Sequence, residues 1–384
     1  MKNIFSHDYK HATLILNLSI LVCFLIIFYY HFSSGFVMSS DSKRFSRWAD
    51  ELIRLNFNFF DFFSIDKASH RPSLLFFSVP VVVIALCKIL FANDWQFVFL
   101  IFNLLLLFIS IIVYSKILLL VGVRKILISL ALPIIVLSVD ILIWPRYILS
   151  DMIYSFFVLI SVYFIIELII NNKLKVFKFL FIIILLLGSR PSSVPVIFAI
   201  ILFVGCFNFE ILKRKKYILF SIFIMIASIP FILSFLYLII DNNFSEINKV
   251  NFITNMVKKG MIIHDRPDTW LDAPNNLFEI INIYFFRFIN FFNPYASTFS
   301  LIHILLNFFQ LFLILFSILI WCFDVEKETI DKIFFYIIML AISVAAFHSF
   351  ILIDYDWRYR FPIILPILIL IPISMELTLK KINR

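Results

Sequence analysis

Glycine, cysteine and charged residues are scarce in this chain. Only 15% of its 384 residues are charged and 63% are apolar, with 51 Phe against 5 Gly. The four cysteines lie far apart inside apolar runs, without a Cys-x-x-Cys motif or a Cys/His cluster, so neither a disulfide framework nor a zinc site is indicated. Walker, GxGxxG, HExxH and GxSxG motifs are also missing, which argues against a nucleotide-driven pump and against the familiar serine and zinc hydrolases.

Apolar runs of about twenty residues dominate what the sequence does contain. A soluble fold would have to bury nearly all of them in a core too large for one domain. We therefore predict an all-α polytopic membrane protein, with residues 1–384 forming a single integral membrane domain and no soluble domain. The runs cover residues 12–30, 72–92, 97–120, 126–143, 152–170, 179–209 (with a break at 188–192), 217–240, 297–322, 333–353 and 361–379.

The run at 72–92 decides the topology, because it holds Pro80 at its centre and Lys88 near its end. If it does not cross and the N-terminus is inside, the later inside loops carry fifteen Lys and Arg and the outside loops carry nine. The positive-inside rule thus favours a re-entrant or interfacial 72–92, about ten transmembrane helices and two cytoplasmic termini. The first outer loop then spans 31–96, and a large outer loop spans 241–296. The net charge of +9 follows from this loop asymmetry, so we expect no nucleic-acid partner.

An amphipathic segment follows Asp41 in the first outer loop. Its apolar residues recur at the helical spacing of three and four: Phe45, Trp48, Leu52, Leu55 and Phe59. Its opposite face is charged and includes Lys43, so we expect this helix to lie in the membrane interface. Asp41 either caps the helix or serves as a catalytic base. The two roles are compatible, because a carboxylate fixed by its own backbone is well positioned as a base.

Two further outer segments carry charge beside proline or serine. Arg71 lies at the start of the 72–92 run and indicates either an interfacial anchor or a phosphate clamp. The short loop that ends at Asp151 also contains Arg146. Ser150 or Asp151 can cap the helix that follows. Alternatively, Asp151 is a second acid near Asp41. It would then orient an acceptor molecule, bind a divalent metal or change the affinity of Asp41 for protons.

The remaining charged positions lie in breaks between later apolar runs. Arg190 interrupts the 179–209 run beside a proline, which costs several kcal/mol unless the residue faces a polar cavity or the interface. Arg358, Tyr359 and Arg360 precede the last helix, where they form either an aromatic belt with snorkelling Arg or a contact for a phosphate or sugar ring. His264 lies in the large outer loop, which can serve as an acceptor-binding lid.

Taken in order, these segments resemble the polyprenyl-phosphate-sugar glycosyltransferases of the GT-C superfamily, in particular the protein mannosyltransferases and aminoarabinose transferases. The resembling elements are Asp41 in the first outer loop, Arg71-Pro72-Ser73, Ser150-Asp151, Ser189-Arg190-Pro191, and Arg358-Tyr359 followed by Pro362. The match covers the first 200 residues and the late Arg-Tyr pair. It departs from the family pattern where Arg44 replaces a frequent Tyr and Ser73 replaces a second Pro. The large C-terminal soluble domain of some members is also absent.

The resemblance implies an enzyme of the bacterial inner membrane with its active site on the outer face. It implies inverting transfer of a sugar from a polyprenyl-phosphate donor to a surface glycan or lipid-linked acceptor. Asp41 and Asp151 are then the expected catalytic residues, and no cofactor is required beyond an optional divalent metal. Donor phosphate would contact Arg71, Arg190, Arg358 and Arg360; further substrate contacts would be Lys43, Arg146, Tyr359 and His264. The alternatives are an O-antigen-type polysaccharide polymerase, which uses a pyrophosphate-linked donor, and a lipid-linked sugar flippase or transporter.

Overall fold

The computed structural model describes residues 2–63, 73–173, 175–208, 277–295, 299–323, 328–350 and 357–382. Over these ranges the chain is helical, and the strand-like pairing there is one isolated bridge between Val37 and Tyr147. The predicted all-α fold is therefore confirmed for this part of the protein. The predictions that concern Arg71, His264 and the run 217–240 lie outside the described residues.

The chain divides into two compact units. Unit 1 comprises Met1–Val194, Pro294–Ile337 and Phe361–Arg384, and unit 2 comprises Pro195–Asn293 and Ile338–Arg360. Up to residue 193 the elements, all in unit 1, are α1 (Lys2–Ser34), α2 (Ser40–Arg54), α4 (Ser73–Phe76), α5 (Ser78–Phe91), η1 (Ala92–Asp94), α6 (Trp95–Val121), α7 (Lys125–Val136), α8 (Val139–Ile143), η2 (Trp144–Arg146), α9 (Asp151–Asn171), α10 (Val176–Leu187) and η3 (Pro191–Ser193). The later elements are α11 (Val194–Asn208), α15 (Leu277–Phe291), α16 (Leu301–Phe323), α17 (Glu328–Phe350), η7 (Trp357–Tyr359), α18 (Phe361–Leu368) and α19 (Leu370–Ile382).

Six helical segments among the described residues are long and apolar enough to cross a membrane. They are Lys10–Ser34, Ser78–Val121, Asp151–Asn171, Leu301–Phe323, Glu328–Ser349 and Phe361–Ile382. Helix α1 leaves a series of large apolar side chains about half exposed, among them Leu14, Leu18 and Leu25. Water does not tolerate such a surface over a whole helix, whereas lipid does. The protein is therefore a helical integral membrane protein, while the predicted number of ten crossings stays a prediction.

Two predicted runs are built differently from single straight helices. The run 126–143 consists of α7 and α8, which are bent by 60° at the break, so the segment is either a broken span or a re-entrant one. The run 179–209 breaks where the sequence predicts, between α10 and η3. Polar groups occupy both breaks. Asp140 of α8 is buried and accepts a hydrogen bond from the indole N–H of Trp144 at 3.3 Å.

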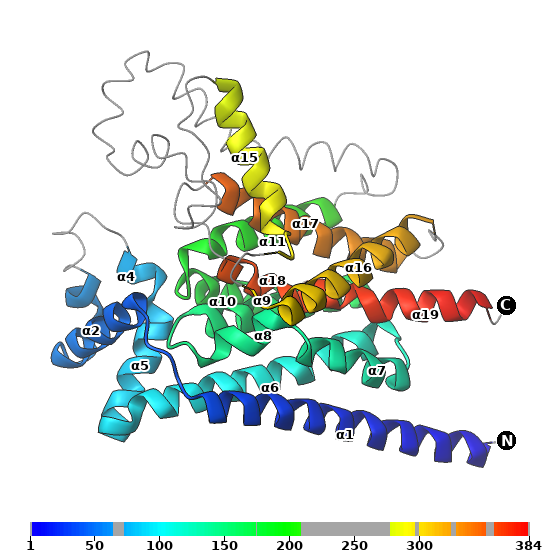
Figure 1. Cartoon of the computed structure of the whole chain (residues 1–384), viewed down its shortest axis with the longest axis horizontal. Helices are drawn as coiled ribbons and strands as arrows, with labels where there is room; N and C mark the ends of the chain where they lie inside the picture. Colours follow the sequence, from blue (N-terminus) through cyan, green and yellow to red (C-terminus); the bar gives the residue numbers. More distant parts are fainter. Residues whose placement is uncertain are drawn as a thin grey trace. The chain divides into compact units, whose positions relative to one another are not determined.

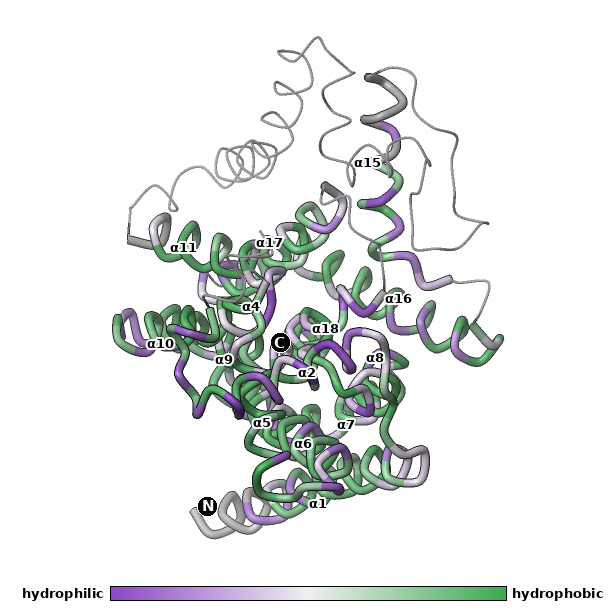
Figure 2. The backbone as a smooth tube through the Cα atoms, turned by 90° about the vertical axis from the view of Figure 1, so that its left-hand side faces the viewer, coloured by the Kyte–Doolittle hydropathy of each residue, from purple (hydrophilic) through white to green (hydrophobic). Residues whose placement is uncertain are grey.

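Helix α5 turns across the beginning of α6 instead of continuing its axis, and α2 lies against it (Figure 1). With 14 residues, α5 is about 21 Å long, less than the roughly 30 Å of a bilayer core. The 27 residues of α6 are long enough to cross alone. In Figure 2 the tube of α2 is largely hydrophilic, and that of α6 is mostly hydrophobic.

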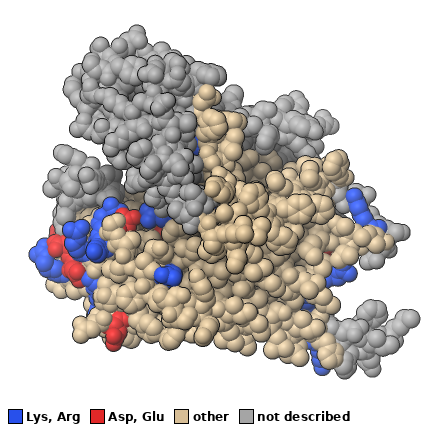
Figure 3. Space-filling view, in the orientation of Figure 1, with Lys and Arg blue, Asp and Glu red and all other residues tan. Residues whose placement is uncertain are grey.

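Charged side chains gather at the two ends of unit 1. Figure 3 shows Lys, Arg, Asp and Glu over α2 on one side and Lys and Arg on the opposite side, with a mostly uncharged surface between them. The beginning of α1 and the end of α19 lie at the same end, opposite α2 (Figure 1). This arrangement agrees with an even number of crossings, because only then do both termini share one side.

Candidate functional site

Several predicted segments meet at one end of unit 1. We call this the α2 end and define it as segment 35–39, α2, α5, segment 144–151 and segment 188–193. Each segment is attached to another by the specific contacts described below. The α2 end therefore brings together residues that are more than 100 positions apart in the sequence.

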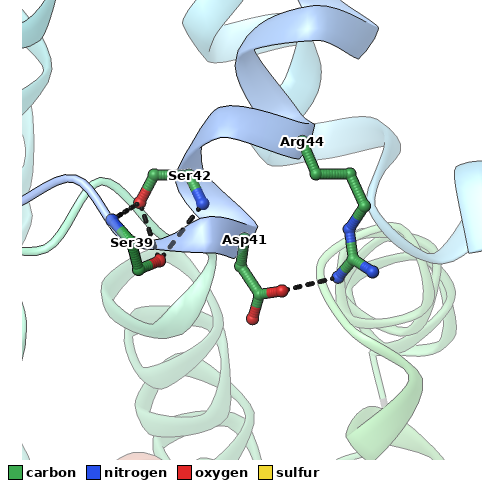
Figure 4. Close-up of polar contacts among 4 residues, drawn as sticks. All are labelled: Ser39, Asp41, Ser42 and Arg44. Carbon is green, nitrogen blue, oxygen red and sulfur yellow. Dashed lines mark hydrogen bonds and ion pairs between the residues drawn. The ribbon is translucent and has the colours of Figure 1, made fainter.

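Asp41 lies in the first turn of α2 but does not cap the helix. The cap is Ser39, whose hydroxyl accepts a hydrogen bond from the backbone N–H of Ser42 at 3.2 Å (Figure 4). The hydroxyl of Ser42 accepts one from the N–H of Ser39 at 3.0 Å, which completes a capping box. The proposed capping role of Asp41 is thus wrong, because Ser39 already satisfies the helix end. The carboxylate is left for other interactions near the positive end of the helix dipole.

Arg44 holds the carboxylate of Asp41. Its Nη2 donates to Oδ1 of Asp41 at 3.0 Å, and the side chains of Arg44 and Asp41 are 42% and 27% exposed (Figure 4). The guanidinium carbon of Arg44 also lies 5.2 Å from the ring centre of Trp48 and 5.7 Å from that of Phe45. These contacts fix Arg44 from two sides. Asp41 is consequently an oriented carboxylate that solvent or a substrate can reach.

The segment before α2 pairs with the loop that precedes Asp151. The N–H of Val37 donates to the carbonyl of Arg146 at 2.9 Å, and the N–H of Ile148 donates to the carbonyl of Val37 at 3.1 Å. Asn103 of α6 holds the same loop through the carbonyl of Pro145 at 3.0 Å. This bridge places the Asp41 helix beside the second acid-bearing loop, as the sequence motifs predict.

Asp151 and Arg190 form a buried ion pair. Nη1 of Arg190 donates to Oδ1 of Asp151, and the side chains of Arg190 and Asp151 are only 7% and 2% exposed. One helical turn further, the hydroxyl of Tyr154 donates to the carbonyl of Ser192 at 2.6 Å. The alternative that Ser150 caps α9 through its side chain is not realised, since its hydroxyl makes no cap hydrogen bond. The pair joins α9 to the break in the 179–209 run.

Close backbone contact attaches segment 188–193 to the beginning of α5. The N–H of Val79 donates to the carbonyl of Gly188 at 2.9 Å. A Cβ atom on Gly188 would lie 2.8 Å from Oγ of Ser78 and 3.0 Å from Cγ2 of Val79, so a side chain here would force both neighbouring side chains to shift. Glycine is favoured at this position by space, not by backbone conformation.

Helices α2 and α5 are joined by one lysine. Nζ of Lys88 donates to the hydroxyl of Ser46 at 2.8 Å and to Oδ1 of Asp50 at 2.6 Å. The rings of Phe45 and Phe77 pack at 4.9 Å between the same helices. The predicted apolar face of α2 is confirmed as far as Leu52, but the helix ends at Arg54. Positive φ angles at residues 56 and 57 then turn the chain, so Phe59 lies beyond the helix.

The solvent side of α2 carries further charge. Lys43, a predicted substrate contact, is exposed there. Arg54 donates to Glu51 through Nε at 2.9 Å, and this hydrogen bond lowers the pKa of the Glu51 carboxyl and raises the pKa of Arg54. The side chain of Arg54 is 68% exposed and that of Glu51 is 33% exposed, so the pair lies on the solvated face of α2 and adds little to stability.

The late Arg-Tyr motif belongs mainly to unit 2. Arg358 lies over the ring of Tyr359 at 5.5 Å, and that ring stacks on His348 at 4.4 Å with an interplanar angle of 9°. Arg360 is buried and donates to the carbonyl of Asn293 at 2.9 Å. The aromatic contacts agree with either sequence interpretation, belt or ring-binding surface.

Sequence reasoning missed three buried polar residues. Arg287 of α15 is among the most buried side chains and donates to the carbonyl of Ser349 at 3.4 Å. His31 contacts the carbonyl of Ile141 at 3.2 Å through Nε2. Tyr154 lies in the run 152–170, for which the sequence predicts only an apolar helix. Arg287 and His31 each lie directly between two aromatic residues in the sequence, and a polar group in such surroundings or within an apolar run is the signal that could have identified all three.

No group of three metal-ligating side chains occurs among the residues that the structure describes. Asp151, which the sequence suggested for a divalent metal, faces Arg190 instead. Comparison with protein-family models, with curated proteins and with solved structures finds no match for this chain.

Proposed function

We propose that the protein is an inverting membrane glycosyltransferase that moves a sugar from a polyprenyl-phosphate donor to a glycan or lipid-linked acceptor. The observation that carries this proposal is the bridge of Val37 to Arg146 and Ile148. It holds an accessible carboxylate, Asp41, beside the loop that leads to the Asp151–Arg190 pair. A base and a cation for a phosphate leaving group are the two elements that such a transfer needs.

In this mechanism Asp41 is the general base. It takes the proton from an acceptor hydroxyl while the oxygen attacks the anomeric carbon. The bond from that carbon to the donor phosphate oxygen breaks, and the electron pair leaves with polyprenyl phosphate. One in-line displacement inverts the anomeric centre, as in a one-step glycosidase. The phosphate ester supplies the driving force, so no nucleotide site is required.

Arg190 is the cation that we assign to the leaving phosphate in the described part of the chain. Its side chain is buried, and an interaction between charges is stronger in a buried site than in water. Asp151 is the more buried member of the pair, at 2% exposed against 7% for Arg190, and it is bonded to Arg190, which supports a positioning role toward Arg190. Arg71, Arg358 and Arg360 remain proposed phosphate ligands, and Arg146, Lys43, Tyr359 and His264 remain proposed substrate contacts.

Arg44 links the availability of Asp41 as a base to the binding of the donor. In the protein without substrate, the guanidinium of Arg44 is paired with Oδ1 of Asp41 and lies over the rings of Trp48 and Phe45. An incoming donor phosphate competes for the same cation, because Arg binds phosphate in a bidentate way. Donor binding would then release Oδ1 for the acceptor proton, which makes the base available after the donor is in place.

The active site would face the outer side of a bacterial inner membrane. The excess of Lys and Arg in the predicted inside loops supports this orientation. The shortness of α5 and its attachment to α2 through Lys88 support an interfacial 72–92 segment. With this topology the α2 end would lie at the outer surface, where a lipid-linked donor would present its sugar.

The purified protein, reconstituted in vesicles, can be tested with two donor classes and a panel of glycan acceptors. We expect sugar transfer from a polyprenyl monophosphate sugar, with inversion at the anomeric carbon. Transfer only from a pyrophosphate-linked oligosaccharide would indicate the polymerase alternative. Counterflow of the labelled lipid without any new glycosidic bond would indicate a flippase and would overturn the proposal.

A further inference from the structure

A cavity of about 260 Å³ lies at the end of unit 1 opposite the α2 end. Helices α6, α9, α17 and α19 contribute to it. Its apolar lining comes from Leu120, Val121, Ile170, Ile330, Ile373 and Leu377. Glu376 and Lys380 line it as well, so the cavity combines an apolar wall with a charged edge.

The charged edge is held together by one buried carboxylate. Oε2 of Glu376 accepts hydrogen bonds from the backbone N–H of Arg124 at 3.1 Å and from its Nε at 3.0 Å. Oε1 of Glu376 pairs with Nζ of Lys380 at 3.1 Å. The side chain of Glu376 is 5% exposed, whereas those of Arg124 and Lys380 are 51% and 46% exposed. The carboxylate therefore fixes two cations whose outer parts face away from the protein.

Positive charge exceeds negative charge around this edge. Lys125 and Lys381 adjoin the two cations in sequence, and Lys125 donates to Thr13 at 2.6 Å. The neighbouring helix α17 adds two acids. Glu328 pairs with Lys332 at 2.8 Å, and Asp331 accepts the indole N–H of Trp321 at 3.0 Å. Among the described residues, these five cations and three carboxylates therefore lie on the segments around this edge, which gives it a net positive charge beside an apolar cavity.

We propose that this cavity binds an anionic phospholipid of the membrane leaflet. Its phosphate contacts Arg124 and Lys380, and the first part of one acyl chain enters the cavity. The exposed terminal nitrogens of Arg124 suit a phosphate, and Glu376 preorganises both cations. The volume lies slightly below the range of about 300–1,000 Å³ that holds a complete small ligand, so only part of a lipid fits. The site is independent of the glycosyltransferase proposal.

Native mass spectrometry of the full chain in detergent can test this site with phosphatidylglycerol, phosphatidylcholine of the same chains, and glycerol 3-phosphate. We expect saturable binding of phosphatidylglycerol only. The double variant Arg124→Gln/Lys380→Gln removes two cations and is expected to weaken this binding about thirtyfold. The matched control is Lys173→Gln. It removes one exposed cation at the same end of unit 1 that does not line the cavity.

Val121→Phe separates lipid binding from folding, because it fills the cavity and leaves all charges in place. Loss of phosphatidylglycerol binding in this variant, with an unchanged thermal unfolding midpoint, is expected. Equal binding of phosphatidylcholine would overturn the role of the cations. Equal binding of glycerol 3-phosphate, or unchanged lipid binding by Val121→Phe, would overturn the role of the cavity.

Discussion

The buried pair of Asp151 and Arg190 gives the sharpest quantitative prediction. Both side chains are less than one tenth exposed, so removal of one partner leaves an unpaired charge away from water. Such a change costs about 3–5 kcal/mol, which alters the unfolding equilibrium roughly one hundred- to several thousand-fold. Asp151→Asn and Arg190→Gln are each expected to lose this much in free energy of unfolding.

The double variant Asp151→Asn/Arg190→Gln should be much less affected than either single variant. Burying two neutral amides costs less free energy than burying one unpaired charge, and the two amides can hydrogen-bond to each other. We expect a coupling energy of about 2 kcal/mol or more from the double-mutant cycle, because contacting residues are not additive. Reversible unfolding in detergent, followed by tryptophan fluorescence, measures all four proteins.

The exposed pair of Glu51 and Arg54 is the matched control. It is an ion pair on the solvated side of α2, and Glu51→Gln is expected to leave the unfolding midpoint unchanged. If the Asp151 and Arg190 variants lose less than about 1 kcal/mol, or if their losses simply add, the pair behaves as a surface ion pair. Burial would then not determine the strength of the pair, and the positioning role of Asp151 would be excluded.

Four further predictions concern the α2 end. Gly188→Val is expected to cost about 1–3 kcal/mol, because its side chain would overlap Ser78, and Ser78→Gly should restore part of that loss in the same unfolding assay. Ser39→Ala removes the cap of α2 and should cost about 1 kcal/mol, whereas a null effect would argue against the capping box. Lys88→Met is expected to speed hydrogen exchange in α2, since its bonds to α2 are lost; unchanged exchange would contradict this attachment. Arg44→Gln should raise KM for the donor, with a smaller effect on KM for the acceptor, and the reverse order would exclude its phosphate role.

The sequence predicted the class of fold and the main segments of the candidate site for physical reasons. Long apolar runs require helices in a bilayer, since every backbone polar group must be satisfied within the segment. The break at Arg190 was visible because a charge and a proline interrupt an apolar run. The proximity of Asp41 to the loop before Asp151 followed from the predicted topology and the resemblance, and the Val37 bridge now supplies its contacts.

Other features depend on contacts that a linear pattern does not contain. Ser39, not Asp41, caps α2. Serine and aspartate both favour the N-cap position, so the sequence alone does not distinguish them, whereas the backbone geometry does. The partner of Arg190 could not be predicted, since 39 positions separate it from Asp151. The bend between α7 and α8 lies beside Ser138 and Asp140, but these two polar residues in an apolar run do not by themselves distinguish a bend from a buried polar contact in a straight helix. The Asp41–Arg44 pair could have been expected, because residues three apart on a helix are neighbours.

The most direct test of the central claim compares two asparagine substitutions on the same helix. Asp41→Asn removes the proposed base, whereas Asp50→Asn removes an exposed carboxylate that pairs with Lys88. Sugar transfer from a polyprenyl monophosphate donor is measured with both purified, folded variants at saturating substrates. We expect Asp41→Asn to lower kcat by about 10²–10⁴-fold, and Asp50→Asn to retain most of it. Normal transfer by Asp41→Asn would contradict the account.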